Sequence, residues 1–192
     1  MRTDSSNKVR EYLDGLKTVL DDIDVEGIDK LISVLVQAYE NEKQVFMFGN
    51  GGSGSTASHL ACDLNKGCCH GLKKRFKVMC LNDSIPTILA YANDVGYDAV
   101  FIEQLKNFMK ADDVVIGFSG SGNSQNVINA IEHARKNGAY TIGLSGYDGG
   151  KLAKNVDLSI HVAVDDMQKA EDAHFIICHI IMQAIFTELN PK

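Results

Sequence analysis

Apolar residues recur at three- and four-residue steps through the first forty positions of the chain. This spacing gathers them on one side of an α-helix, and it predicts a helix from about Ser5 to Asp22 and a second helix directly after it. Two helices therefore precede the first predicted strand. We expect them either to cover a sheet or to contact a partner chain.

Five short apolar runs farther along the chain indicate buried β-strands. The runs are Val45–Phe48, Phe76–Leu81, Asp113–Phe118, Tyr140–Leu144 and Leu158–Val162. Segments with helical spacing separate these runs, and the connections are short. The stretch from Cys68 to Arg75, before the second run, is expected to be a basic surface connection. Strands that alternate with helices form parallel sheets covered on both faces, so the sequence predicts an α/β fold, a three-layer α/β/α sandwich around a five-stranded parallel sheet. We expect residues 1–192 to form a single domain.

The last predicted helix spans about Met167 to Leu189 and is apolar nearly all round. The surface of a monomer cannot bury a helix of this kind, because surface helices keep one polar face in water. The sequence therefore predicts that this helix packs inside an oligomer.

Composition narrows the possible partners. The chain has 192 residues, of which 45% are hydrophobic, and a formal net charge of −6. It carries no dense cluster of Lys and Arg, so a nucleic-acid partner is not expected. No apolar run approaches the roughly 20 residues of a membrane span, and the first seven residues are polar rather than typical of a signal peptide, so no membrane partner is expected either.

The cysteines point to a reducing compartment. There are five of them, an odd number, and none follows the Cys-x-x-Cys spacing. Together with the absence of an export signal, this indicates reduced thiols and a cytoplasmic protein. Cys68, Cys69 and His70 could attract a metal ion, but no second cluster completes such a site.

The stretch Gly117–Ser124 lies between the third predicted strand and a helix. Such a loop presents free backbone N–H groups and the positive end of the helix dipole. The hydroxyls of Ser119, Ser121 and Ser124 alternate with glycines, including Gly120, which let the backbone close on a ligand. This combination predicts a phosphate site. The alternative is a Ser/Gly turn with a helix N-cap, for which one serine would be enough.

A second glycine-rich loop follows the first predicted strand. Gly49, Gly51 and Gly54 match the G-x-G-x-x-G pattern of dinucleotide-binding folds. Asp83 follows the next strand, where a ribose-binding acid would lie, so a dinucleotide-dependent enzyme is an alternative. Two long helices come before this loop, however, and the loop at Ser119 is better supplied for a single phosphate.

Four motifs occur in order along the chain: Gly49-Asn50-Gly51-Gly52-Ser53, Asn93-Asp94, Ser119-Gly120-Ser121-Gly122-Asn123-Ser124 and Gly146-Tyr147-Asp148-Gly149-Gly150-Lys151. In this order they resemble sugar isomerase (SIS) domains, and among these the phosphoheptose isomerases, which convert sedoheptulose 7-phosphate to a heptose 7-phosphate. The resemblance covers almost the whole chain. It implies a flavodoxin-like fold with two N-terminal helices and a long C-terminal helix, and a homotetramer with active sites between subunits.

The resemblance also implies roles for single residues. The residues that it assigns to binding of the sugar phosphate are Asn50, Gly51, Gly52, Ser53, Asn93, Asp94, Ser119, Gly120, Ser121, Ser124 and Glu171. Asp63 matches the catalytic base, which is a glutamate in the family, and His179 matches the second catalytic residue. A divalent metal, zinc in the family, would be held by His59, Asp63, Glu171 and His179. Glu171 replaces a glutamine, and a family arginine after the base is missing, with Lys66 nearby.

Spacing on the helices adds independent support. His59 and Asp63 stand four residues apart and share a helix face, although a solvated ion pair is an alternative. His179 lies in the apolar last helix, where a histidine is more often buried than catalytic; His174 is such a candidate, and we assign it no role. Glu171 and His179 are eight residues apart, about 12 Å along a helix, so we expect them to serve different sites or to converge across a subunit interface.

Interconversion of a ketose and an aldose moves a proton between C1 and C2 through an enediol. A carboxylate and an imidazole suit this reaction because both can gain and lose a proton near neutral pH. The sequence thus predicts an isomerase whose expected substrate is sedoheptulose 7-phosphate. Two alternatives are an isomerase for a hexulose or pentose phosphate and a non-catalytic SIS module that binds a sugar phosphate or a protein partner.

Overall fold

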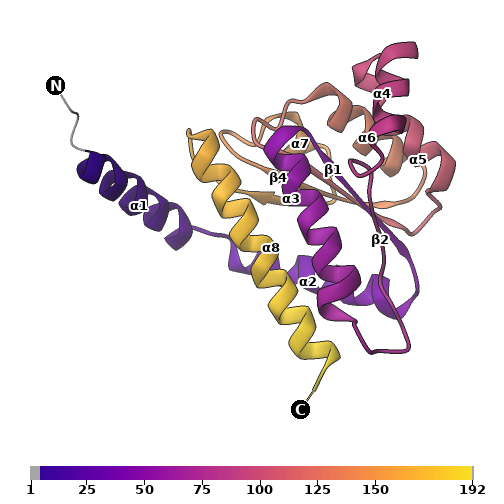
Figure 1. Cartoon of the computed structure of the whole chain (residues 1–192), viewed down its shortest axis with the longest axis horizontal. Coiled ribbons are helices and arrows are strands. Elements are labelled where there is room, and N and C mark those ends of the chain that lie inside the picture. The colour runs from indigo at the N-terminus through magenta and orange to yellow at the C-terminus, as the bar shows by residue number, and fades with distance from the viewer. Residues whose placement is uncertain (1–4, 192) are drawn as a thin grey trace.

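A computed structural model describes residues 5–191 and places one parallel sheet at the centre of the molecule (Figure 1). The sheet has five strands in the order β2-β1-β3-β4-β5. The strands are β1 Gln44–Gly49, β2 Lys77–Cys80, β3 Val114–Ser119, β4 Tyr140–Ser145 and β5 Leu158–His161. The predicted five-stranded parallel sheet is confirmed, and its strand order is that of flavodoxin-like folds.

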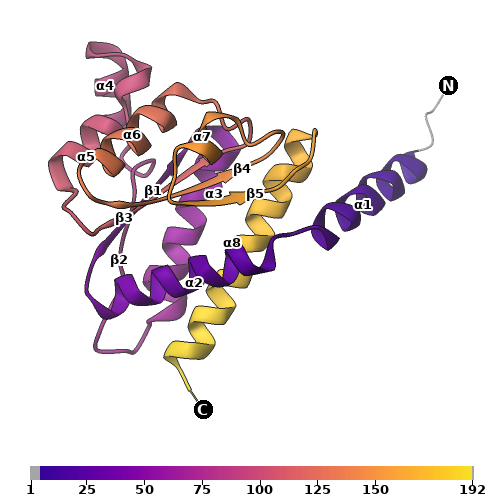
Figure 2. The ribbon, with the colours of Figure 1, turned by 180° about the vertical axis from the view of Figure 1, so that it is seen from behind.

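Helices cover both faces of this sheet (Figures 1 and 2). The α-helices are α1 Ser5–Asp21, α2 Val25–Glu40, α3 Gly51–Cys62, α4 Ile85–Asp94, α5 Ile102–Phe108, α6 Gln125–Lys136, α7 Gly150–Lys154 and α8 Met167–Leu189. A π-helix, η1 Asp63–Cys68, continues α3, and a 3-10 turn, η2 Tyr97–Ala99, follows α4. Since α2, α3 and α8 pack on one face and α5, α6 and α7 on the other, the three-layer sandwich is confirmed.

Alternation along the central strands divides the core into two halves. Val45 and Met47 of β1 face α2, α3 and α8, whereas Phe46 and Phe48 face α5 and α6. All four side chains are fully buried. Successive strand residues point to opposite faces, and here both faces are covered by helices. This is why the strands appear in the sequence as continuous apolar runs.

Two helices contribute no buried residue to the core of this chain. Figures 1 and 2 show that α1 extends outward from one end of the molecule and that α4 projects from the opposite end. Val9 and Leu13 on α1, and Ile85 and Leu89 on α4, are at least half exposed. Of the two N-terminal helices, α2 therefore covers the sheet, while α1 has the exposed apolar face that is typical of a contact with another protein.

The last helix has one face buried within this chain, which corrects the expectation that a monomer cannot bury it. Ile177, Ile181 and Ile185 lie fully in the core, while Ile180 and Phe186 remain 44% and 46% exposed. Among the described residues, α8 is the one helix long and apolar enough to cross a membrane. A helix in a protein core has the same length and composition, so this is weak evidence for a span. Packing of the exposed half of α8 inside an oligomer stays a prediction.

Two predicted loops are partly helical. Because α3 begins at Gly51, the glycine- and serine-rich stretch expected to be a loop through Thr56 forms the first turns of the helix. Gly54 N–H closes the first turn on the Asn50 carbonyl at 3.2 Å. Tertiary contacts override the low helix propensity of glycine here. Likewise, α7 forms where the sequence indicated only a connection after β4.

The segment after η1 also differs from its prediction. The connection from Cys68 to Arg75 was expected at the surface, but Cys68 and Cys69 are fully buried. Burial raises the pKa of the Cys68 thiol to about 12. A thiol that stays protonated is a poor metal ligand.

Candidate active site

The strand order reverses between β1 and β3, which pair in the middle of the sheet. β1 leads into α3 on one face, whereas β3 leads into α6 on the other. In open α/β sheets, ligands bind at the carboxyl ends of the two strands where the connections diverge in this way. Both predicted phosphate loops, which start at Gly49 and Gly117, lie at this position.

The first turn of α3 presents backbone donors at this edge of the sheet. Asn50 is the N-cap residue, and its side chain makes no capping hydrogen bond. The N–H groups of Gly51, Gly52 and Ser53 point out of the helix end, as the first N–H groups of any helix do. Together with the positive end of the helix dipole, they form a place suited to an anion.

Close packing explains two glycines of this turn, Gly52 and Gly49. A Cβ atom at Gly52 would come within 2.6 Å of a carboxylate oxygen of Glu171 on α8. A Cβ atom at Gly49 would lie 2.8 Å from the carbonyl carbon of Ser53. Larger residues at either position would push α8 or the start of α3 away. Of the other glycines in the G-x-G-x-x-G pattern, Gly51 has a φ of +53°, and a Cβ atom at Gly54 would lie 2.8 Å from the Gly49 carbonyl oxygen. Backbone geometry and close packing thus account for the pattern without a dinucleotide.

The loop after β3 forms a tight turn that is closed by a hydrogen bond within its own backbone. Gly122 N–H donates to the Ser119 carbonyl at 2.9 Å, and a Cβ atom at Gly122 would lie 2.2 Å from the Gly149 carbonyl oxygen. Ser124 is the N-cap residue of α6, yet its side chain makes no capping hydrogen bond. Its hydroxyl instead accepts a hydrogen bond from the Ser119 hydroxyl at 3.2 Å. The alternative of a simple turn and cap does not explain this use of Ser124.

The third serine of the loop borders open space. The Ser121 hydroxyl accepts a hydrogen bond from Asn123 N–H at 3.2 Å. Beside it lies a cavity of about 600 Å³, whose lining also includes Tyr147, Asp148 and Asp165. The loop therefore presents a hydroxyl group to a cavity large enough for a small molecule.

A hydrogen-bond network that the sequence did not reveal connects the two loops. The amides of Asn50 and Asn126 pair through two 2.9 Å hydrogen bonds in opposite directions. The Tyr97 hydroxyl donates to the Asn50 side-chain oxygen at 2.9 Å. Asn82 binds both the N–H and the carbonyl of Gly49, at 3.1 and 2.8 Å. Asn50, which was predicted to bind substrate, is thus engaged within the protein and fixes the turn between β1 and α3.

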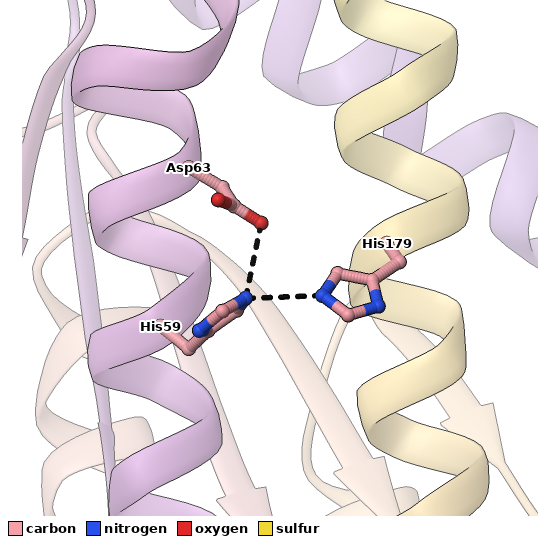
Figure 3. Close-up of side chains that lie close together, drawn as sticks. All are labelled: His59, Asp63 and His179. Carbon is pink, nitrogen blue, oxygen red and sulfur yellow. Dashed lines mark hydrogen bonds and ion pairs between the residues drawn. The ribbon is translucent and has the colours of Figure 1, made fainter.

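Three chemically active side chains converge from two helices (Figure 3). Figure 3 shows His59 and Asp63 on one helix and His179 facing them from α8. His59 Nε2 lies 3.0 Å from His179 Nε2 and 3.4 Å from an Asp63 carboxylate oxygen. The side chains of His59 and Asp63 are 41% and 22% exposed, so a small molecule can reach them. The three could also hold a metal ion, because one ligand atom of each lies within 4.8 Å of the others.

The helix changes its winding at this group. Asp63 is the first residue of the π-helix η1, and π-helical segments occur frequently at functional sites. A Cβ atom at Gly67, one turn further on, would lie 2.8 Å from the end of the Met182 side chain on α8. The absence of a side chain at Gly67 therefore lets α8 lie close beside the helix end that carries Asp63.

The structure does not bring all predicted site residues together. Glu171 lies beside Gly52, at the first turn of α3, and is not in the group formed by His59, Asp63 and His179. Within this one chain, the four predicted metal ligands thus do not share one position.

The Asn-Asp pair, which is the second motif, lies elsewhere. Asn93 and Asp94 end the projecting helix α4, where their side chains are joined by a 2.7 Å hydrogen bond. The turn that follows carries Tyr97, whose hydroxyl reaches the Asn50 side chain. The pair is therefore linked to the loop after β1 through η2, and its contact with a sugar stays a prediction.

His174 is the buried histidine that the sequence suggested. It is 1% exposed, and its Nε2 lies 3.2 Å from the Ser145 carbonyl oxygen at the end of β4. Burial lowers the pKa of His174 from 6.5 to about 4, so the ring is neutral near pH 7 and donates from Nε2. This bond joins α8 to the carboxyl end of the sheet, and it thereby sets the position of the helix that carries His179.

Known proteins are similar to this chain in sequence and in fold. A model of the SIS domain matches residues 11–146. The phosphoheptose isomerase of Aliarcobacter butzleri is 34% identical over 95% of this chain and 97% of its own length. The phosphoheptose isomerase of Sulfurimonas denitrificans is 36% identical over 86% of this chain and 84% of its own length.

Solved structures agree with these matches. The phosphoheptose isomerase of Neisseria gonorrhoeae superposes with a TM-score of 0.87 at 27% identity, covering 94% of this chain and 97% of that one. The corresponding enzyme of Francisella tularensis gives 0.87 at 26% identity, covering 95% of this chain and 98% of that one. Since the family model matches most of the chain and the relatives cover nearly all of it, the chain belongs to the SIS domain family, among the phosphoheptose isomerases.

Proposed function

We propose that the chain is a ketose–aldose isomerase that converts sedoheptulose 7-phosphate to glycero-manno-heptose 7-phosphate through an enediol. The observation that carries this proposal is the convergence of His59, Asp63 and His179 within 4.8 Å. His59 follows Gly52 by seven residues, about 10 Å along the helix. An extended seven-carbon sugar phosphate is long enough to reach from the anion site at the start of α3 to this group.

Local donors hold the phosphate, because the chain as a whole is negatively charged. The N–H groups at the start of α3 supply one side of the phosphate site. The serines that supply hydroxyl groups are Ser53, Ser119, Ser121 and Ser124. Asn93 and Asp94 bind hydroxyl groups of the sugar. Anchoring the phosphate leaves C1 and C2 as the end of the sugar that reaches the histidines.

Asp63 removes the carbon-bound proton from C1 of the ketose and returns a proton to C2 of the enediol. His179 carries the matching oxygen protons, donating one to O2 and accepting one from O1, so the reaction is balanced. His59 contacts both residues and keeps them facing the same point. Positioned acid–base groups of this kind contribute about 10²–10⁴-fold to a rate.

The same side chains suit a divalent metal, for which zinc is the best candidate. Zinc binds imidazole nitrogen at about 2.0–2.1 Å in a tetrahedral site, which separates neighbouring ligand atoms by about 3.3 Å. The distances from His59 Nε2, 3.0 Å to His179 and 3.4 Å to Asp63, fit this spacing. Glu171 would join only by moving from Gly52 or by coming from another subunit. A bound metal would polarise the sugar carbonyl and stabilise the enediolate charge.

The exposed apolar faces support an assembly. We expect a cytoplasmic homotetramer with its active sites between subunits, as the family likeness implies. Helices α1 and α4 have no fully buried residue within one chain, and both carry exposed apolar side chains. Burying such faces against other copies stabilises an oligomer at about 25 cal/mol per Å² of apolar surface.

A panel of ketose phosphates tests the proposal. The purified chain is incubated with sedoheptulose 7-phosphate, a hexulose 6-phosphate and a pentulose 5-phosphate, and aldose products are identified. Conversion of the heptulose alone is the expected result. Binding without conversion would instead establish the non-catalytic module, which the named relatives do not favour. Conversion of only the shorter sugars would establish the other isomerase. Activity that survives exhaustive chelation would count against a catalytic metal.

A further inference from the structure

A phenylalanine ring contacts both histidines of the site. The Phe175 ring on α8 lies 4.7 Å from the His59 ring and 4.6 Å from the His179 ring, centroid to centroid. The two imidazole rings are 5.1 Å apart. All three separations fall within the roughly 4.5–7 Å range of interacting aromatic pairs. The three rings therefore form a closed cluster, and one of its members carries no donor or acceptor atom.

Among the residues that the structure describes, the polar contacts of the site hold each imidazole at Nε2 only. His59 and His179 meet through their Nε2 atoms, and the Asp63 carboxylate also approaches His59 at Nε2. A ring held at a single nitrogen can still turn about its side-chain bonds, particularly at a site that is partly open to solvent. Contact with a third ring removes this freedom.

The sequence places Phe175 where it can contact both rings. It stands four residues before His179, so the two side chains share a face of α8. The same face meets His59 across the contact with α3. A single side chain thus restrains one imidazole on its own helix and another on the neighbouring helix.

We propose that Phe175 is a positioning residue, whose ring holds the imidazoles of His59 and His179 so that both Nε2 atoms meet at one point beside Asp63. The inference rests on the proposed function, because it concerns the same site. Phe175 supplies no proton and no ligand atom. It acts by ordering the two rings before substrate or metal binds, which reduces the entropy lost on binding.

Three variants separate this role from simple packing. Phe175→Leu removes the ring but keeps an apolar side chain, and Phe175→Tyr keeps the ring. Phe76→Leu is the matched control, because Phe76 is buried and its ring contacts that of Tyr39 in a tilted arrangement at 4.9 Å, outside the three-ring cluster. Thermal unfolding of each variant measures how much stability each substitution removes.

Nuclear magnetic resonance of the metal-free protein reads the ring contact directly. The Phe175 ring current shifts the imidazole proton signals of both histidines. We expect Phe175→Leu to move the signals of His59 and His179, while Phe175→Tyr and Phe76→Leu leave them near their original positions. Unchanged signals for both histidines in Phe175→Leu would overturn the proposed contact.

Zinc titration and steady-state kinetics measure the effect of the Phe175 ring on metal binding and on turnover. Residues that orient metal ligands change affinity by about 10–100-fold, so Phe175→Leu should weaken zinc binding by that factor. Its kcat should fall at least tenfold while KM for the ketose phosphate stays within about twofold, because the serine loop is unchanged. Phe175→Tyr should keep the zinc affinity and kcat of the parent protein.

The outcomes also distinguish this inference from the proposed function. Parental zinc affinity and kcat in Phe175→Leu would overturn the positioning role and leave the isomerase assignment intact. A parent protein that converts no ketose phosphate would overturn the assignment, and zinc affinity and ring signals would then decide the role of Phe175. Equal losses in Phe175→Leu and Phe76→Leu that follow their thermal stability would mean that Phe175 only packs.

Discussion

At the scale of single residues, the chemistry depends on a short carboxylate beside two imidazoles. The family resemblance implies a glutamate at the position of Asp63, whose side chain is one methylene shorter. The Asp63 carboxylate lies 3.4 Å from His59 Nε2, at the residue where η1 begins. The shorter side chain therefore still reaches the first imidazole.

Substitutions at Asp63 test whether this shorter carboxylate acts as the base. Asp63→Asn removes the proton acceptor without changing the size of the side chain, so kcat should fall by about 10²–10⁴-fold while KM is unchanged. Asp63→Glu keeps the acid but displaces it by one methylene. A displacement of about 1 Å can cost about 10²-fold, so this variant should retain part of the activity that Asp63→Asn loses. Steady-state kinetics on sedoheptulose 7-phosphate measures both, and equal activity of the three proteins would exclude Asp63 as the base.

The sequence singled out some residues of the candidate site and could not single out others. His59 and Asp63 were found from their four-residue spacing and the family motif, and His179 from the motif alone. Asn126, Tyr97 and Phe175 were not found, since their roles come from contacts with residues distant in the sequence. Polar residues near a helix start and an aromatic residue in an apolar helix are ordinary, so no sequence pattern marks them.

At the scale of elements, the site depends on turns at the carboxyl ends of the strands and on the placement of α8. The glycine-rich turns allow close approach, and the buried hydrogen bond between His174 and Ser145 joins α8 to the sheet. The sequence predicted glycine-rich loops at these strand ends, but it placed the start of α3 too late and missed α7. Low helix propensity of glycine and serine suggested a loop, whereas close packing of Gly52 against Glu171 and the backbone hydrogen bond from Gly54 to Asn50 favour a helix.

The turn after β3 makes a prediction about substrate affinity. Gly122 has a φ of +65°, and a Cβ atom there would meet the Gly149 carbonyl oxygen, so Gly122→Ala should distort the serine loop. We expect KM to rise at least tenfold with a smaller change in kcat. Gly138→Ala is the matched control, because Gly138 has a φ of +80° but meets only Ala111, at 3.5 Å or more. Similar KM values for the two variants would contradict a phosphate site in this loop.

The buried histidine makes a prediction about pH. The folded-state pKa of His174 is about 4, below its ordinary value of 6.5, so the unfolded chain takes up the proton first as the pH falls. Stability from this group is therefore fully present above pH 6.5 and is lost progressively toward pH 4. The loss amounts to about 3 kcal/mol. In His174→Gln the free energy of unfolding should fall less steeply between these pH values, as measured by denaturant titration; parallel curves would contradict this role.

At the scale of the whole molecule, the pattern of apolar residues explains the layered fold. It does not determine how copies of the chain would assemble. Continuous apolar strands alternating with amphipathic helices were enough to predict a parallel sheet covered on both faces. The direction in which α1 and α4 project could not be predicted, because neither helix has a fully buried residue that fixes it against the core. Their exposed apolar side chains are what a larger assembly would cover.

The assembly makes a prediction about mass. The parent chain has a mass of 21.0 kDa, and we expect light scattering coupled to size-exclusion chromatography to measure a particle of about four times this mass. Leu89 on α4 is 62% exposed, and Leu89→Glu places a charge in that face, so a lower mass is expected. Ser33→Glu introduces the same residue at an exposed position of α2 and should leave the mass unchanged. A monomeric parent would contradict the proposed tetramer.

The central claim is that Asp63 and His179 move protons on a ketose phosphate bound at the carboxyl edge of the sheet. Turnover of sedoheptulose 7-phosphate in deuterium oxide, followed by nuclear magnetic resonance, tests it most directly. An enediol route predicts solvent deuterium at C2 of the heptose 7-phosphate formed by the parent, and loss of the labelled product in Asp63→Asn and in His179→Ala. Labelled product formed at the parental rate by both variants would contradict the account.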